Sequence, residues 1–110
     1  SNRAKEQDLG VQASTIQKYG AVSAETAREM AEGARHKANT DLGLAVTGIA
    51  GPTGGNKDKP VGLVYISLAS SGHTICEQHH WRGTREQIKN RTALAALQLL
   101  WKTVRASRSN

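Results

Sequence analysis

The chain has 110 residues, of which 37% are hydrophobic and 22% charged, and its formal net charge is +6. This length fits one globular domain, and a core supplied by Ala, Leu, Ile and Val without any Phe favours a tightly layered α/β fold. A single cysteine excludes an intramolecular disulfide, and no apolar run reaches the roughly 20 residues that span a bilayer. We therefore expect a cytoplasmic protein with no membrane partner.

The positive charge supports nucleic-acid binding only weakly. Lys102, Arg105 and Arg108 lie in the last stretch, and residues 1–101 without them carry +3. Neither a recognised binding motif nor a set of stacking aromatic residues accompanies the charge. We expect residues 105–110 to form a frayed basic tail and do not expect nucleic acid to be a partner.

Two helices are expected in the first 40 residues. Residues 1–12 fit either the end of a strand or the start of a helix. The stretch 13–19 predicts a short helix that ends at Gly20, and Ser23 is suited to cap a longer helix that runs to about residue 36. Five small or flexible residues fall on one face of this longer helix: Ala24, Ala27, Met30, Ala31 and Ala34. They predict close packing against a sheet.

Three strands are expected between residues 42 and 81. The stretch 42–50, LGLAVTGIA, is apolar at both alternating positions, which is typical of a strand covered on both faces. We therefore expect it at the centre of the sheet. Residues 63–69 and 73–81 are separated by a Ser-Ser-Gly turn and predict a hairpin.

A long helix is expected to close the chain. Thr84 and Gln87 have the spacing of a capping box, and the helical pattern continues to about residue 104. An apolar stripe runs along this helix: Ala93, Leu94, Leu97, Leu100, Trp101 and Val104. We expect the stripe to cover one face of the sheet.

A glycine-rich loop follows the strand at 42–50. Its glycines permit positive φ angles and let backbone N–H groups approach an anion closely. The loop lacks the Gly-Lys-Ser/Thr triplet of a Walker loop, since Asn-Lys-Asp stands at 56–58, and it does not match GxGxxG followed by a helix. Two interpretations stay open, a ligand-binding loop or a connection shaped by its glycines and prolines.

The polar residues of the last predicted strand do not form a metal site. His73, Cys76, His79 and His80 are close in sequence, but alternation along a strand leaves no three of them on one side. The two histidines nearest Cys76 by spacing, His73 and His79, lie on the other face, so Cys76 is expected to be a small buried hydrophobe.

Three arginines surround the start of the final helix: Arg82, Arg85 and Arg91. Together with the Thr84 hydroxyl and the free N–H groups of the helix start, they could seat a phosphate. A solvated helix end explains the same residues equally well, and the sequence leaves both interpretations open.

Five stretches, in this order, carry a resemblance to a known family: SNRAK at 1–5, YGAVS at 19–23, AVTGIAGPTGG at 45–55, KPVGLVYISLA at 59–69 and GTREQIKNRTALAALQLL at 83–100. They resemble the CinA C-terminal domain family, which includes nicotinamide-nucleotide amidases. The resemblance implies a three-layer α/β/α sandwich with a mixed sheet over residues 1–104, lacking roughly the first third of the family domain. It also implies hydrolysis of nicotinamide mononucleotide to nicotinate mononucleotide and ammonia, in pyridine-nucleotide recycling, without a cofactor or metal.

The same resemblance assigns a catalytic role to Lys5. The family segment reads Tyr-Ser-Asn-x-x-Lys, and this chain begins at its second residue, so Lys5 matches the assisting lysine. The family's serine nucleophile belongs to a Glu-Ser-x-Thr-Gly-Gly stretch that the present sequence does not contain. We therefore expect these residues alone to be inactive.

Loop chemistry suggests where a nucleotide substrate would bind. Backbone N–H groups of a glycine loop can stabilise a tetrahedral oxyanion without reorganising. The residues expected to line the pocket are Thr47, Gly48, Gly51, Gly54 and Gly55, with Thr84 and Arg85 for the phosphate. A non-catalytic nucleotide-binding or assembly module remains the alternative. Because a missing third would uncover a sheet edge or apolar surface, we also expect a homo-oligomer.

Overall fold

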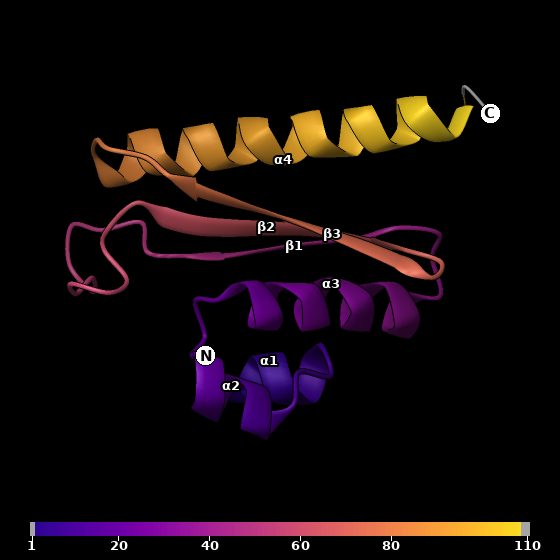
Figure 1. Cartoon of the computed structure of the whole chain (residues 1–110), viewed down its shortest axis with the longest axis horizontal. Coiled ribbons are helices and arrows are strands. Elements are labelled where there is room, and N and C mark those ends of the chain that lie inside the picture. The colour runs from indigo at the N-terminus through magenta and orange to yellow at the C-terminus, as the bar shows by residue number, and fades with distance from the viewer. Residues whose placement is uncertain (1, 109–110) are drawn as a thin grey trace.

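The computed structural model describes residues 2–108, which form a three-layer α/β/α sandwich with two short helices outside it (Figure 1). Helix α4 (Arg85–Arg108) covers one face and α3 (Ala24–Ala38) the other. Two short helices, α1 (Asn2–Asp8) and α2 (Ala13–Tyr19), lie in a layer beyond α3. The expected α/β sandwich is confirmed, and the undecided first residues are helical.

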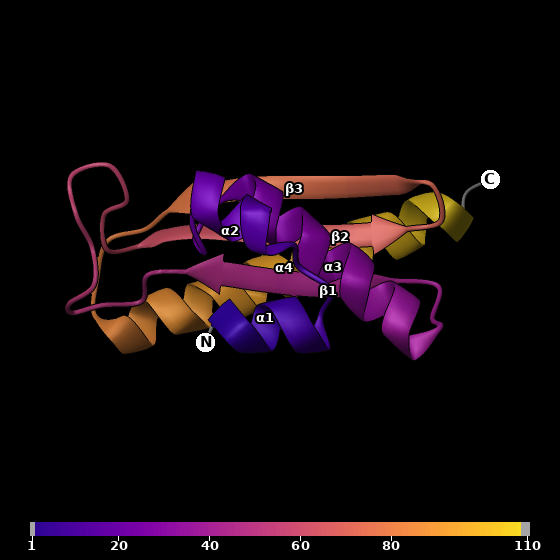
Figure 2. The ribbon, with the colours of Figure 1, turned by 90° about the horizontal axis from the view of Figure 1, so that it is seen from below.

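The sheet consists of β1 (Gly43–Gly48), β2 (Leu63–Ser70) and β3 (His73–His80), in the order β1-β2-β3 (Figure 2). Both pairs of neighbours are antiparallel, where a mixed sheet was expected. The predicted hairpin of β2 and β3 is confirmed, with Ser67 opposite Cys76.

Among the described strands β2 holds the centre of the sheet and β1 lies at its edge, where the first strand was expected at the centre. The burial of β1 alternates strictly: Ala45 and Thr47 are buried on the α3 face, while Leu44 and Val46 are each 38% exposed. Helix α4 packs mainly over β2 and covers the other face of β1 only in part. The continuous apolar run therefore did not mean burial on both faces.

The predicted start of α3 is confirmed. Ser23 Oγ accepts a hydrogen bond from Thr26 N at 3.1 Å, which satisfies one of the free donors of the first turn. Ala27 and Ala31 are completely buried, so the small side chains let α3 pack closely against the sheet. The short helix α2 ends at Gly20, as expected.

Two apolar clusters stabilise the layers. On the α4 side, the buried residues are Val64, Ile66, Leu68, Ile88, Ala95, Ala96 and Leu99. On the α3 side, they are Val11, Met30, Ala31, Ala45 and Ala69. Both clusters take residues from β2, so the central strand joins the two halves of the core.

The apolar stripe predicted for the final helix is confirmed only in part: Leu100 packs against the core and Val104 is half-buried, but the other four residues are exposed. Leu94, Leu97 and Trp101 are 58%, 62% and 64% exposed and turn away from the sheet. Helix α4 instead buries a second set of apolar residues: Ile88, Ala95, Ala96 and Leu99. The helix also continues to Arg108, so residues 105–108 are not a frayed tail, and 109–110 lie outside the described residues.

Candidate active-site loop and groove

The glycine-rich loop connects β1 to β2 at one end of the sheet and is held by hydrogen bonds within itself (Figure 2). At its base, Ile49 N donates to Leu63 O at 3.0 Å and Gly62 N donates to Ile49 O at 2.7 Å. At its tip, Asn56 Oδ1 accepts from Asp58 N and from Lys59 N, at 2.9 and 2.8 Å. The loop contains no helix or strand, and these hydrogen bonds hold its conformation.

Gly51 connects the loop to the start of α4. It is buried with φ +84°, and an added Cβ would lie 2.6 Å from Val61 Cγ1, so both conformation and space require glycine. Its carbonyl oxygen accepts a hydrogen bond of 3.0 Å from Arg85 Nη1. The structure thus brings two of the predicted site residues into direct contact.

Thr47 lies on the opposite side of the sheet from the α4 groove. Its side chain is buried, and Oγ1 donates to Ala21 O at 2.7 Å, in the turn between α2 and α3. The Lys59 ammonium reaches the same region and donates to Tyr19 O. The hydroxyl of Thr47 therefore holds the end of β1 against the turn before α3.

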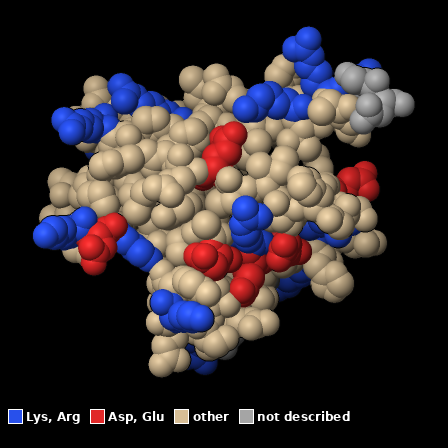
Figure 3. Space-filling view, viewed as in Figure 1, with Lys and Arg blue, Asp and Glu red and all other residues tan. Residues whose placement is uncertain are grey.

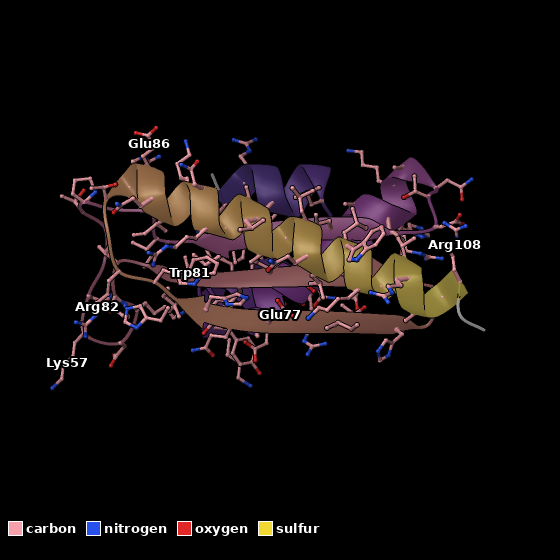
Figure 4. The ribbon with its side chains drawn as sticks, turned by 90° about the horizontal axis from the view of Figure 1, so that it is seen from above. Lys57, Glu77, Trp81, Arg82, Glu86 and Arg108 are labelled. Carbon is pink, nitrogen blue, oxygen red and sulfur yellow. The ribbon has the colours of Figure 1, made fainter. Side chains whose placement is uncertain are left out.

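The start of α4 has the predicted capping box. Gln87 N donates to Thr84 Oγ1 at 3.1 Å, and Thr84 N donates to Gln87 Oε1 at 2.9 Å. The arginines nearby do not converge, since Arg91 donates to Arg82 O at 3.3 Å while Arg85 turns to the loop. Figure 4 shows Arg82 and Glu86 on opposite sides of α4.

An apolar groove of about 280 Å³ lies between β1 and α4. It is lined by Val46, Gly48, Ala50, Val64, Ile88, Lys89, Thr92 and Ala93. Beside it lies a polar hollow of about 460 Å³, lined by Arg85, Glu86, Lys89 and Asn90. Because Lys89 borders both, the apolar groove meets a polar hollow that carries two cations and one carboxylate.

Lys89 and the apolar walls of the groove were missed from the sequence. Lys89 lies four residues after Arg85, a spacing that places both on one side of a helix, so this signal was available. The walls were not predictable, because they depend on how far α4 extends over β1.

Three other predicted residues, Lys5, Gly54 and Gly55, are not among the residues that line the groove. Gly54 and Gly55 are exposed in the loop, and within residues 2–108 their backbone N–H groups donate to no protein acceptor. Lys5 is half-buried in α1, and in the part of the chain that is described no hydrogen bond or ion pair joins its ammonium to the loop or to α4. Its carbonyl oxygen accepts from Leu9 N and Val11 N.

The histidines of β3 take part in surface contacts. The His79 ring stacks on Trp81 with 4.6 Å between centroids, and its Nε2 lies 3.1 Å from Glu77 Oε1. Burial raises the pKa of the Cys76 thiol, although the charge of Arg28 opposes the shift. The described residues contain no group of three His, Cys, Asp or Glu that could hold a metal ion. Nor, between residues 2 and 108, does any helix combine the length and apolarity needed to cross a membrane.

Comparison with known proteins identifies the family of this chain. The family model described as CinA C-terminal domain matches residues 1–104. The chain belongs to the CinA C-terminal domain family.

Curated relatives are much longer than this chain. A putative competence-damage inducible protein of Acetivibrio thermocellus is 55% identical over 100 residues, which cover 91% of this chain and 24% of that protein. A CinA-like protein of Syntrophomonas wolfei is 54% identical over the same shares of both chains. The chain therefore spans about a quarter of the length of these relatives.

Solved structures share the fold. The competence/damage inducible protein CihA from Agrobacterium tumefaciens superposes with a TM-score of 0.90 at 38% identity, over 93% of this chain and 63% of that one. A CinA superfamily protein from Enterobacter cloacae gives 0.88 at 31% identity, over 94% and 61%. These structures contain a further part for which the present chain has no counterpart.

Proposed function

We propose that this chain is part of an amidohydrolase that converts nicotinamide mononucleotide to nicotinate mononucleotide and ammonia. The observation that carries the proposal is the meeting of an apolar groove with the cations Arg85 and Lys89 beside the glycine loop. A mononucleotide with a pyridine base needs both environments, an apolar slot for its ring and positive charge for its phosphate. Membership of the CinA C-terminal domain family supports the same assignment.

The chemistry requires more than these residues supply. An amide is a poor electrophile, so a hydroxyl nucleophile needs a base, and a lysine can serve when its surroundings keep it neutral. The resemblance assigns these roles to a serine that this sequence does not contain and to Lys5. We therefore assign catalysis to a longer form of the protein and propose that the 110 residues alone bind the nucleotide without turnover.

The glycine loop would stabilise the tetrahedral intermediate. The N–H groups of Gly54 and Gly55 are exposed, and within the described part of the chain they donate to no protein acceptor, which suits donors for a developing oxyanion. The bond from Arg85 to Gly51 O would hold these donors in place relative to the phosphate site.

Ammonia release from nicotinamide mononucleotide tests the proposal in a longer form that includes the serine segment. We expect Gly51→Ala and Arg85→Ala each to lower kcat/KM by about tenfold or more, because one strains the loop and the other removes its anchor. Arg35→Ala is the matched control, since Arg35 Nε also donates to a carbonyl, that of Asp41 at 3.3 Å, at the far end of β1. Unchanged turnover and affinity in both loop variants would exclude these roles.

A non-catalytic nucleotide-binding module is the second candidate. It is favoured by one observation: the groove and the cations Arg85 and Lys89 lie together, whereas among the described residues no hydrogen bond or ion pair joins the Lys5 ammonium to the loop or to α4. On this alternative, nicotinamide mononucleotide binds to the 110-residue chain and to any longer native form, and neither releases ammonia. Calorimetry of the binding combined with the ammonia assay separates the two candidates.

A further inference from the structure

The glycine loop, residues 49–62, is attached by its two halves to helices on opposite sides of the sheet. In its first half, Gly51 O accepts a hydrogen bond of 3.0 Å from Arg85 Nη1 of α4. In its second half, the Lys59 ammonium donates to Tyr19 O, the carbonyl of the last residue of α2. Figure 1 shows α4 and α2 on opposite sides of the sheet. Between the two attachments, residues 52–58 are all exposed, so the two cations bound the free part of the loop.

The Lys59 ammonium binds a turn that is itself held by hydrogen bonds. The last carbonyl groups of a helix lack partners within the helix and carry partial negative charge, which favours a cation at Tyr19 O. The next carbonyl, Gly20 O, accepts from Ser23 Oγ at 2.9 Å and from Thr26 Oγ1 at 2.7 Å. Because Ser23 and Thr26 are buried, the turn after α2 is a fixed point of attachment for the loop.

Glycine at position 20 leaves room for the ammonium. Gly20 has a φ of +88°, and an added Cβ would lie 2.7 Å from Lys59 Nζ. Figure 3 shows acidic as well as basic side chains at the end of the molecule where the loop lies, but between residues 2 and 108 no ion pair joins Lys59 to its neighbour Asp58. The Lys59 side chain is therefore directed by the carbonyl after α2 and not by a nearby carboxylate.

The backbone of Lys59 carries this attachment to the two glycines at the tip of the loop. Lys59 O accepts from Asn56 N at 2.9 Å, and Lys59 N donates to Asn56 Oδ1 at 2.8 Å. Asn56 directly follows Gly54 and Gly55 in the chain. An added Cβ on Gly55 would lie 2.5 Å from Val61 N, so this glycine packs against the backbone just after Lys59. The placement of both glycines therefore depends on where Lys59 is held.

We propose that Lys59 is a positioning residue that orients the amides of Gly54 and Gly55, the donors assigned to the oxyanion. The inference rests on the proposed function of the loop. Donors stabilise an oxyanion only when they are oriented before the reaction, and these two amides are exposed and lack protein acceptors in the described part of the chain. Arg85 holds the loop before the donors and Lys59 holds it after them.

Ammonia release by the longer form that includes the serine segment tests this role. Lys59→Met removes the ammonium and is expected to lower kcat by about tenfold, with KM for nicotinamide mononucleotide within about twofold, because Lys59 orients the donors without touching the substrate. Lys59→Arg keeps a cationic donor and is expected to restore kcat to within about threefold of the wild type. A rise in KM with kcat unchanged would overturn the proposal and assign Lys59 to substrate binding.

Lys57→Met is the matched control. Lys57 belongs to the same loop and extends away from the rest of the molecule in Figure 4, and within residues 2–108 its side chain makes no hydrogen bond or ion pair. We expect this variant to leave both kcat and KM unchanged. Circular dichroism verifies that each variant is folded, and Lys59→Ala replaces Lys59→Met if the latter does not fold.

Nuclear magnetic resonance relaxation of the 110-residue chain gives a measurement that does not require activity. The amide order parameters of Gly54, Gly55 and Asn56 are expected to fall in Lys59→Met and to stay unchanged in Lys57→Met. Unchanged order parameters in Lys59→Met would overturn the proposal, as would unchanged kcat. If the wild type releases no ammonia, the proposed function fails, and the order parameters alone decide whether Lys59 holds the loop.

Discussion

Gly51 and Arg85 are 34 residues apart in the chain, and their hydrogen bond fixes the candidate site. Each was chosen from the sequence for a separate reason, the glycine for its conformational freedom and the arginine for its charge near a helix start. Their contact was not predictable, because it depends on how the loop folds back toward α4. The same is true of Thr47, whose hydroxyl donates to Ala21 O below the sheet.

Cys76 offers a test at the level of one residue. Burial raises the pKa of its thiol, so the thiolate forms only at a pH above the ordinary range for cysteine. We expect iodoacetamide to alkylate folded Cys76 more slowly than the urea-unfolded chain at pH 8, with the rate still rising above pH 9. Below the pKa of the unfolded thiol this group does not change stability with pH, and it favours unfolding as pH rises toward the folded value.

The alkylation measurement is unambiguous because the chain has one cysteine. Equal rates for the folded and unfolded chains at pH 8 would contradict the effect of burial.

At the scale of elements, α4 shows why an apolar pattern can mislead. The helix has apolar residues on two faces, and counting at helical spacing selected the face with the larger side chains. The sheet binds the other face because its alanines, Ala95 and Ala96, allow close approach to β2. By contrast, the starts of α3 and α4 were predicted correctly, since the caps at Ser23 and Thr84 depend only on neighbouring residues.

A pair of leucines two positions apart tests the orientation of α4. Leu99 is 3% exposed and Leu97 is 62% exposed. We expect Leu99→Ala to lower the free energy of unfolding by about 3 kcal/mol, because it leaves a cavity in the core. Leu97→Ala should change it by less than about 0.5 kcal/mol. Urea unfolding of both variants provides the measurement, and equal losses would contradict this orientation.

At the scale of the whole molecule, α4 accounts for most of the excess positive charge. Its cations lie on several sides of the helix: Arg85 contacts the loop, Arg91 contacts Arg82 O, and Lys102 Nζ lies 3.6 Å from Glu77. A nucleic-acid surface needs cations along one face, with aromatic rings or groove-reading side chains among them. The arrangement therefore does not favour such a partner.

Binding to duplex DNA follows as a test at this scale. We expect weak binding at low salt that falls to a dissociation constant above about 100 µM at about 0.15 M salt, because only a few phosphates would be neutralised. Fluorescence anisotropy with a labelled duplex measures it. A dissociation constant well below about 100 µM at about 0.15 M salt would show that the charge has a nucleic-acid role.

The sequence by itself determined the properties that arise between near neighbours in the chain. These are the helix caps, the β2–β3 hairpin, the glycine loop and the family motifs, because short-range bonds and turn conformations select them. The tertiary structure alone decided which apolar face of α4 is buried, that β2 lies between the other two described strands, and that Lys89 joins the groove to the polar hollow. Each of these depends on contacts between elements distant in sequence, where several packings satisfy the same apolar pattern and only close fit selects one.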